Sequence, residues 1–339
     1  MMKAYILDRY GKGQVLRLDE VPDPVPDADE VLVEIHATSL NQLDGKIRDG
    51  AFKPILPYKP PVVLGHDLAG IVVAVGAAVR NFKPGDAVYA RPRDGHIGTF
   101  AERIAVNQAD LALKPVNLSM VEAASLPLVA LTVWQVLVEQ VQLKAGQKIL
   151  IHAGSGGVGT LAIQLAKSLG ATVATTTSAA NADLVRSLGA DVVINYRTQD
   201  FSTILSGYDV VLNSLDAKTL EASLKVLRRG GKLISISGPP DPTFAKTQGL
   251  NAVLRLVLNL MSARIRRKAK QAGVDYAFLF MRADGKQLGE IAKLCEAGTI
   301  RPVVDRVFPF AKLNAAMAYV DSSRAKGKVV VSLRDRAVS

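Results

Sequence analysis

The sequence predicts an α/β protein of two domains, one of them built on a doubly wound parallel sheet, and three observations predict this. The chain has 339 residues, more than one simple core needs. Helix, glycine and strand recur in that order in residues 162–177, 182–196 and 220–237. Residues 1–125 instead hold short alternating segments separated by turn signals. The repeated units are typical of a parallel sheet covered on both faces, and the first segment is typical of an all-β module.

The clearest motif is KILIHAGSGGVG, which begins at Lys148. Its first six residues form a short and mostly apolar run with two β-branched isoleucines, as in a buried strand, and residues 160–169 have the leucine spacing of a helix. Between them, glycines stand at the spacing G-x-G-x-x-G. We expect the first glycine to allow a tight turn, the second to admit a pyrophosphate, and the third to let helix and strand pack closely. The motif predicts dinucleotide binding, and an ordinary glycine-rich turn is the alternative.

The end of the next strand, residues 171–177, indicates which dinucleotide binds. A site specific for NAD places Asp or Glu there, on the ribose 2′-hydroxyl. This chain has three threonines followed by Ser178, and no acid until Asp183. Hydroxyl groups suit a 2′-phosphate, so the sequence favours NADPH. The alternative is that Thr and Ser are simply good strand and cap residues.

Composition narrows the compartment and the partners. The formal charge of +11 raises affinity for any anion: a phosphate-rich cofactor, nucleic acid or a membrane surface. Aromatic residues are only 5%, so no stacking platform for single-stranded nucleic acid is evident. The single cysteine, Cys295, excludes an internal disulfide and a cysteine-rich zinc site, and we expect it in the core. The N-terminus lacks the apolar stretch of a signal peptide, and no apolar run reaches the length of a membrane span, so we expect a cytoplasmic protein.

Residues 241–283 depart from the helix–strand rhythm. Residues 250–261 are apolar, and basic residues follow at 264–270. This pattern predicts an amphipathic helix over the cleft with a solvated basic end, and a helix lying on a membrane surface is the alternative. Strands are then predicted at 276–281, 301–308 and 328–333, with a helix at 284–298. We expect this tail to fold back onto the first 125 residues.

Short motifs along nearly the whole chain resemble those of a known family, the zinc-independent medium-chain dehydrogenases/reductases of the quinone oxidoreductase type. The motifs are SLNQLD from Ser39, LGHDLAG from Leu64, FKPGDAV from Phe82, GTFAE from Gly98, the glycine motif, and AKGKVVV from Ala325. The segment around Tyr276–Asp284, with RPVVDR from Arg301, is most similar to the branch that includes the reticulon-interacting mitochondrial reductase.

The resemblance implies a chaperonin-10-like β domain with a Rossmann domain inserted into it. The first would comprise residues 1–126 and 282–339, and the second residues 127–281. It also implies a homodimer that reduces a quinone or an α,β-unsaturated carbonyl with NADPH. Some members of the family are recruited as NADPH-binding, redox-responsive or RNA-binding proteins with little turnover, and this is the alternative function.

Zinc is not expected, because Asn41 stands where the zinc-binding members have a cysteine. His66 alone cannot complete a tetrahedral site, and we expect it to be a hydrogen-bonded turn residue. Something else must polarise the acceptor oxygen. The candidates are the Asn41 amide, the Tyr58 hydroxyl and Lys46, and the alternatives are a turn residue, a packing residue and a solvated charge, respectively.

The resemblance also implies a set of cofactor contacts. The pyrophosphate would lie on Ser155, Gly156, Gly157 and Val158, the nicotinamide would face Thr132, and the 2′-phosphate would lie near Ser178 and Tyr196. Asn213, Ser237 and Phe280 would wall the ribose and nicotinamide site. The phosphate-binding lysine of relatives is Asn181 here, which weakens the NADPH assignment without reversing it, and Arg197 or Lys328 can supply the missing charge.

Overall fold

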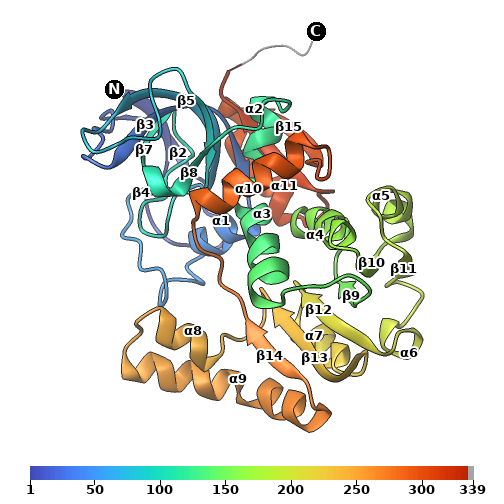
Figure 1. Cartoon of the computed structure of the whole chain (residues 1–339). Coiled ribbons are helices and arrows are strands. Elements are labelled where there is room, and N and C mark those ends of the chain that lie inside the picture. Colours follow the sequence, from blue (N-terminus) through green and yellow to red (C-terminus); the bar gives the residue numbers. More distant parts are fainter. Residues whose placement is uncertain (335–339) are drawn as a thin grey trace. The chain divides into compact units, whose positions relative to one another are not determined.

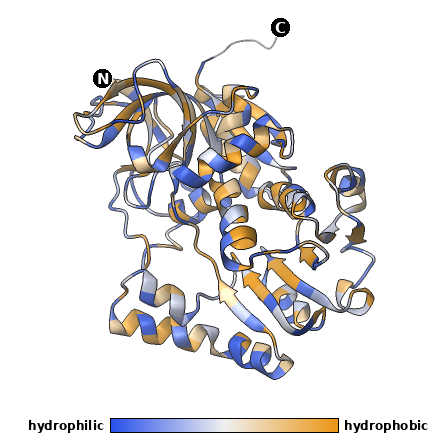
Figure 2. Cartoon of the chain, viewed as in Figure 1, coloured by the Kyte–Doolittle hydropathy of each residue, from blue (hydrophilic) through white to orange (hydrophobic). Residues whose placement is uncertain are grey.

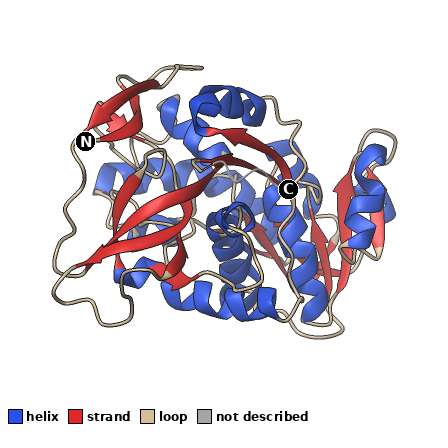
Figure 3. Ribbon diagram, turned by 90° about the horizontal axis from the view of Figure 1, so that it is seen from above, coloured by secondary structure: helices blue, strands red, loops and turns tan. Residues whose placement is uncertain are grey.

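The computed structural model describes residues 1–334 and divides the chain into two compact units. Unit 1 is Met1–Leu131 together with the chain from Arg282 onward, and unit 2 is Thr132–Met281. We expected the first boundary after residue 126. Each unit has its own sheets, and their helices and strands are distinguished by colour in Figure 3.

Unit 1 is the β-rich unit. It holds a sheet in the order β15-β16-β3-β5-β6-β8, with β7 paired to β3, and a small sheet in the order β2-β1-β4 (Figure 1). The strands are β1 (Met2–Leu7), β2 (Arg17–Val21), β3 (Glu30–Leu40), β4 (Val62–Val63), β5 (Asp67–Val75), β6 (Ala87–Ala90), β7 (Arg103–Asn107), β8 (Leu111–Leu113), β15 (Val304–Pro309) and β16 (Lys328–Ser332). The predicted return of the tail is confirmed, because β16 pairs antiparallel with β3.

The helices of unit 1 are α1 (Gln42–Arg48), α2 (Met120–Ala124), α10 (Gly285–Glu296) and α11 (Leu313–Asp321), with short 3₁₀ turns η1 (Gln108–Asp110) and η4 (Phe310–Lys312). The sequence did not predict α1 or α11. Cys295, on α10, lies in the core as expected, and burial raises the pKa of its thiol to about 12. It is therefore a neutral packing residue.

Unit 2 contains a six-stranded sheet, all parallel, in the order β11-β10-β9-β12-β13-β14. Its strands are β9 (Lys148–Ile151), β10 (Thr172–Thr177), β11 (Val192–Asn195), β12 (Tyr208–Asn213), β13 (Leu227–Ser235) and β14 (Asp275–Phe278). Its helices are α4 (Gly157–Ser168), α5 (Ala182–Ser187), α6 (Phe201–Ile204), α7 (Ala217–Ser223), α8 (Pro242–Thr247) and α9 (Ala252–Ala272), with a 3₁₀ turn η3 (Ala179–Asn181). The predicted fold class is confirmed.

The apolar segment that follows α2 is helical but irregular. It is an α-helix, α3, over Pro127–Trp134, and then a π-helical segment, η2, over Gln135–Gln140. The boundary between the two units falls within α3. None of the helices in residues 1–334 combines the length and the apolar run that crossing a bilayer requires.

Candidate active site

The glycine turn of unit 2 lies where the sequence predicts it, but its first glycine is needed for a different reason than expected. The residue with left-handed backbone is Ala153, with φ of +53°, and not Gly154. Gly154 is needed for space instead, since a Cβ there would lie 2.0 Å from Thr175 Oγ1 on the neighbouring strand. A Cβ on Gly159 would lie 2.4 Å from the Ala153 carbonyl oxygen, so the third glycine seats α4 against the turn. Near Gly156 only that same oxygen is close, at 3.3 Å.

The middle glycine therefore leaves the side of the turn open where a phosphate would approach. Gly156 caps α4, which begins at Gly157, earlier than the Thr160 that the leucine spacing indicated. The first N–H groups of an α-helix have no partner within the helix, and its dipole favours an anion there. Ser155 to Val158 thus form an anion cradle of the kind that binds pyrophosphate.

We expect Gly159→Ala to raise the Kd for a dinucleotide at least tenfold. The added Cβ meets backbone atoms that cannot rotate away, so α4 must shift relative to the turn, at a cost of about 1–3 kcal/mol. Gly289→Ala is the matched control, because Gly289 lies within helix α10 without a positive φ and its Cβ would have nothing within 4 Å. Calorimetric titration of both variants tests this. Equal affinity of Gly159→Ala and the unaltered protein would contradict it.

Polar side chains gather next to this turn, at the end of β10. Thr177 Oγ1 and Asn181 Nδ2 each donate to Ser155 Oγ at 3.1 Å. Asn181 Oδ1 is buried and has no hydrogen-bond partner among the described residues. Ser178 is half-buried beside them, and the nearest acid along the chain, Asp183, is exposed.

The neighbouring strand adds an aromatic ring and a cation at the same edge. Asn195 at the end of β11 pairs with Thr177, and the next residue, Tyr196, donates its N–H to the Thr177 carbonyl oxygen at 3.2 Å. The Arg197 guanidinium carbon lies 6.0 Å from the centre of the Tyr196 ring, and both side chains are exposed. The sequence-predicted residues Ser178 and Tyr196 are therefore brought together, with Arg197 beside them.

The other predicted cofactor residues follow the ends of the remaining strands. Asn213, the last residue of β12, donates from Nδ2 to Ser235 Oγ at 3.3 Å, while its Oδ1 is buried without a partner in the described structure. Ser237, just past β13, is exposed and donates to the Leu215 carbonyl oxygen at 2.6 Å. The Phe280 ring, past β14, packs 5.5 Å from that of Phe244.

A dinucleotide fits this edge of unit 2. Carboxyl ends of parallel strands are where such ligands bind, and the cradle, the two unpartnered amide oxygens and the exposed Ser237 all lie there. A buried carbonyl oxygen without a donor costs free energy, and hydroxyl groups of a bound sugar would satisfy it. Thr132 is buried at the start of the unit, within α3.

Unit 1 contains a buried polar network that the sequence did not predict. Its centre is Asp67, at the start of β5, which is fully buried. Asp67 Oδ2 accepts from Ser39 Oγ at 2.8 Å and from Asn41 Nδ2 at 2.9 Å, and Oδ1 accepts from the Leu128 N–H at 2.7 Å. The ammonium of Lys328 lies 3.1 Å from the same Oδ2.

Lys328 belongs to this network rather than to the phosphate that the resemblance implied. Its Nζ donates to Asn41 Oδ1 at 2.5 Å, to Asp67 Oδ2 and to the Leu40 carbonyl oxygen at 3.1 Å. An ammonium has three N–H groups, and all three are used here. The side chain is 6% exposed. Lys328 is thus the counter-ion of a buried carboxylate, and Arg197 remains as the candidate for the phosphate.

The candidate acceptor-polarising residues do not converge. Asn41 is 7% exposed and caps α1, whereas Lys46 lies on the exposed face of that helix. Tyr58 Oη accepts from the Gly95 N–H at 3.3 Å, and burial raises the pKa of its phenol to about 12. No hydrogen bond in residues 1–334 links Tyr58 or Lys46 to Asn41. The phenol stays protonated at neutral pH, so it can donate a hydrogen bond but cannot serve as a base.

His66 is hydrogen-bonded, as expected. Its Nδ1 lies 2.6 Å from Asp44 Oδ1, and its Nε2 is buried without a partner among the described residues. Asp44 Oδ2 in turn accepts from the Asn41 N–H at 2.8 Å. Within residues 1–334, no three His, Cys, Asp or Glu side chains are grouped to hold a metal ion. That the protein works without zinc stays a prediction.

Two family profiles match the chain: the alcohol dehydrogenase GroES-like domain over residues 27–116, and the zinc-binding dehydrogenase domain over residues 188–331. The mitochondrial NAD(P)H oxidoreductase RTN4IP1 of Bos taurus is 33% identical over 98% of this chain and 89% of its own length. The chain belongs to the medium-chain dehydrogenase/reductase family. Within it, the chloroplastic NADPH-dependent alkenal/one oxidoreductase of Arabidopsis thaliana is 36% identical, over 97% of this chain and 79% of its own.

Among solved structures, the quinone oxidoreductase from Coxiella burnetii matches this medium-chain dehydrogenase/reductase with a TM-score of 0.86. It is 30% identical, over 98% of this chain and 99% of its own. The predicted resemblance is therefore confirmed. The predicted cytoplasmic location is wrong by this comparison, since the similar proteins RTN4IP1 and the alkenal/one oxidoreductase are named mitochondrial and chloroplastic. Composition and the missing signal-like stretch carry no information on those compartments.

Proposed function

We propose that this protein is an NADPH-dependent reductase that delivers hydride to a quinone or an α,β-unsaturated carbonyl without a metal ion. The observation that carries this is the carboxyl edge of unit 2, with its anion cradle and the unpartnered oxygens of Asn181 and Asn213. The names of similar proteins support it: they are an NAD(P)H oxidoreductase, an NADPH-dependent alkenal/one oxidoreductase and quinone oxidoreductases. Bound NADPH supplies the hydride, and the chain binds and orients the reactants.

The test is NADPH oxidation, followed by absorbance, with a panel of quinones and enones. We expect turnover with at least one of the two classes. RNA binding at several salt concentrations is measured on the same preparation, because the net charge of +11 also suits a recruited NADPH-binding protein. RNA binding without turnover on any acceptor would contradict the proposed reductase and favour that alternative.

On the cofactor side, we propose that Ser178, Tyr196 and Arg197 hold the 2′-phosphate. The Tyr196 ring and the Arg197 guanidinium lie together after β11, and a guanidinium suits the geometry of a phosphate. The residue after β10 is Ser178, not the acid that would bind the 2′-hydroxyl of NAD. Ser155 to Val158 hold the pyrophosphate. Asn181 and Asn213 accept from sugar hydroxyls, and Thr132, Ser237 and Phe280 complete the nicotinamide end.

We expect NADPH to bind at least tenfold more tightly than NADH, and Arg197→Gln to raise the Kd for NADPH about tenfold. A charge-assisted contact to phosphate of about 1.4 kcal/mol gives this factor. The Kd for NADH should not change, because NADH lacks the phosphate. Arg186→Gln, on the exposed face of α5, is the matched control. Equal losses for both cofactors, or an unchanged preference, would place the 2′-phosphate elsewhere.

On the acceptor side, we propose that Asn41 donates a hydrogen bond to the carbonyl oxygen. Lys328 holds its Oδ1, and Asp67 accepts one of its two amide hydrogens. The second amide hydrogen has no acceptor within the described structure, and its direction is fixed by the other two contacts. Such a preorganised donor stabilises negative charge that develops on the oxygen as hydride arrives at the β-carbon.

The proposal includes a homodimer. In the described structure β14 is the outer strand of its sheet and pairs on one side only, with β13. An open strand edge offers a row of backbone groups to a second chain. Light scattering should give the mass of two chains, and the mass of a single chain over the working concentration range would contradict this part.

A further inference from the structure

Helix α9 exposes an apolar stripe along its first half. The exposed fractions are 71% for Val253, 58% for Leu256, 44% for Val257, 66% for Leu260 and 58% for Met261. Spacings of three and four residues place all five on one side of the helix. Exposed large apolar side chains are ordinary when scattered, but five on one helix face form a contiguous surface that water does not favour.

The fold of unit 2 does not use this stripe. The buried residues of α9 are Leu258, Ser262, Ile265 and Ala269, on another side of the helix. Ile265 and Ala269 belong to the hydrophobic core of the unit, together with Leu233 of β13 and Val274. The helix is therefore anchored through one face, while its apolar stripe points away from the core.

All the charged side chains of α9 are positive. It carries six cations and no acid: Arg255, Arg264, Arg266, Arg267, Lys268 and Lys270. Figure 2 shows the apolar residues toward the first half of α9 and the hydrophilic ones toward its end. Arg264 and Arg267 continue the line of Leu260 along the helix at intervals of four and three residues. Arg264 and Lys268 are paired with Glu221, whereas Arg267 and Lys270 are exposed.

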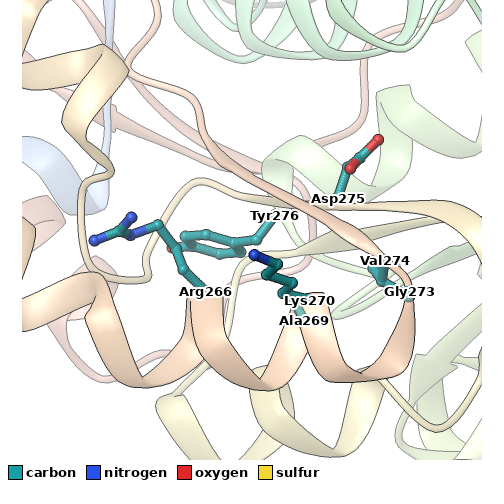
Figure 4. Close-up of a pocket in the computed structure, with 7 residues that line it drawn as sticks. All are labelled: Arg266, Ala269, Lys270, Gly273, Val274, Asp275 and Tyr276. Carbon is teal, nitrogen blue, oxygen red and sulfur yellow. The ribbon is translucent and has the colours of Figure 1, made fainter.

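The basic end also borders a pocket of about 440 Å³ between α9 and β14. Arg266 and Lys270 rise from the helix on the side of Tyr276, as Figure 4 shows. Arg266 is held by the Ser262 hydroxyl at 3.2 Å and by the Asn259 carbonyl oxygen at 3.1 Å. The lining also includes one acid, Asp275, which Arg266 and Lys270 outnumber, so the pocket favours an anionic group such as a phosphate.

We propose that α9 docks the protein onto the surface of an anionic lipid bilayer. The apolar stripe enters the boundary between headgroups and acyl chains, and the basic half lies against lipid phosphates. The apolar side of α9 complements the acyl chains of such a bilayer, and its cations complement the negative charge of the headgroups. A second copy of this chain would bring the same excess of cations against it, because Glu221 offsets only Arg264 and Lys268, so charge favours the bilayer. This surface is additional to the reductase site and does not depend on the acceptor.

The experiment is flotation of the full chain with vesicles. We expect binding to equimolar phosphatidylcholine and phosphatidylglycerol, little binding to phosphatidylcholine alone, and weaker binding as salt is raised. Arg267→Gln with Lys270→Gln should weaken binding about 30-fold, since each cation near an anionic surface contributes about 1 kcal/mol. Leu256→Gln with Leu260→Gln should weaken binding at least tenfold, because two of the apolar side chains that would enter the acyl-chain boundary are lost.

Two matched controls sit elsewhere on unit 2. Lys218→Gln with Lys225→Gln removes the same charge from exposed sites outside α9, and Ile204→Gln replaces an exposed apolar residue on α6. Both should bind vesicles nearly as the unaltered protein does. The proposal is overturned if the unaltered protein ignores anionic vesicles, or if the controls lose as much binding as the α9 variants. It is also overturned if the Leu256 and Leu260 changes alter only the mass in solution, which would assign the stripe to a second copy.

Discussion

Lys328→Met is expected to lower the free energy of unfolding by about 3–5 kcal/mol. The substitution removes the cation from Asp67, whose carboxylate is fully buried and keeps only neutral donors from Ser39, Asn41 and the Leu128 N–H. A buried ion pair stabilises little overall, but breaking it leaves a charge without compensation. Urea unfolding followed by circular dichroism measures the loss.

Lys326→Met is the matched control for this prediction. Lys326 is exposed two positions earlier in the chain, and its replacement should change the stability by no more than about 0.5 kcal/mol. Adding Asp67→Asn to Lys328→Met should restore part of the loss, because the remaining buried group is then neutral. If Lys328→Met is as stable as the control, Lys328 is not the counter-ion of the network.

Asn41→Ala is expected to lower kcat toward enones about 10²–10³-fold, the usual cost of losing one oxyanion donor. The NADPH affinity should stay within about twofold, because the proposed contact is with the acceptor. With quinones the loss should be smaller, since the reduced product spreads its charge over an aromatic ring. Tyr58→Phe should cost less than Asn41→Ala, because water can donate a hydrogen bond in place of the lost phenol. Steady-state rates with one enone and one quinone provide the measurement.

The Asn41 change also disturbs the buried network, so it needs a control that disturbs the network alone. Ser39→Ala removes another hydrogen bond to the same Asp67 oxygen without touching the proposed acceptor. It should cost about 1 kcal/mol of stability and leave kcat nearly unchanged. Similar losses of kcat in both variants, or normal turnover of Asn41→Ala with every acceptor, would reduce Asn41 to a structural residue.

Elements with strong local patterns were predictable from the sequence alone. The strand β10 lies where the sequence predicts it, and β9, the glycine turn and α4 come in the predicted order before it. Strand and helix periodicity and the volume of glycine are properties of a few neighbouring residues, so the sequence expresses them directly. The same holds for the amphipathic α9 and its basic end. Helix α11 was not predicted, although Leu313, Met317 and Val320 stand at helical spacing in the sequence.

What the sequence by itself determined is therefore the fold class, the family and the position of the glycine turn before α4. Only the tertiary structure shows why residue 154 must be glycine, which is the close approach of Thr175 on the neighbouring strand. Only the tertiary structure shows the role of Lys328. Lys328 meets Asp67 across 261 positions, because β16 pairs with β3 at Val329 and Leu40, and β3 pairs with β5 at Ser39 and Asp67. Strand register brings these side chains together, and register depends on the packing of the whole sheet.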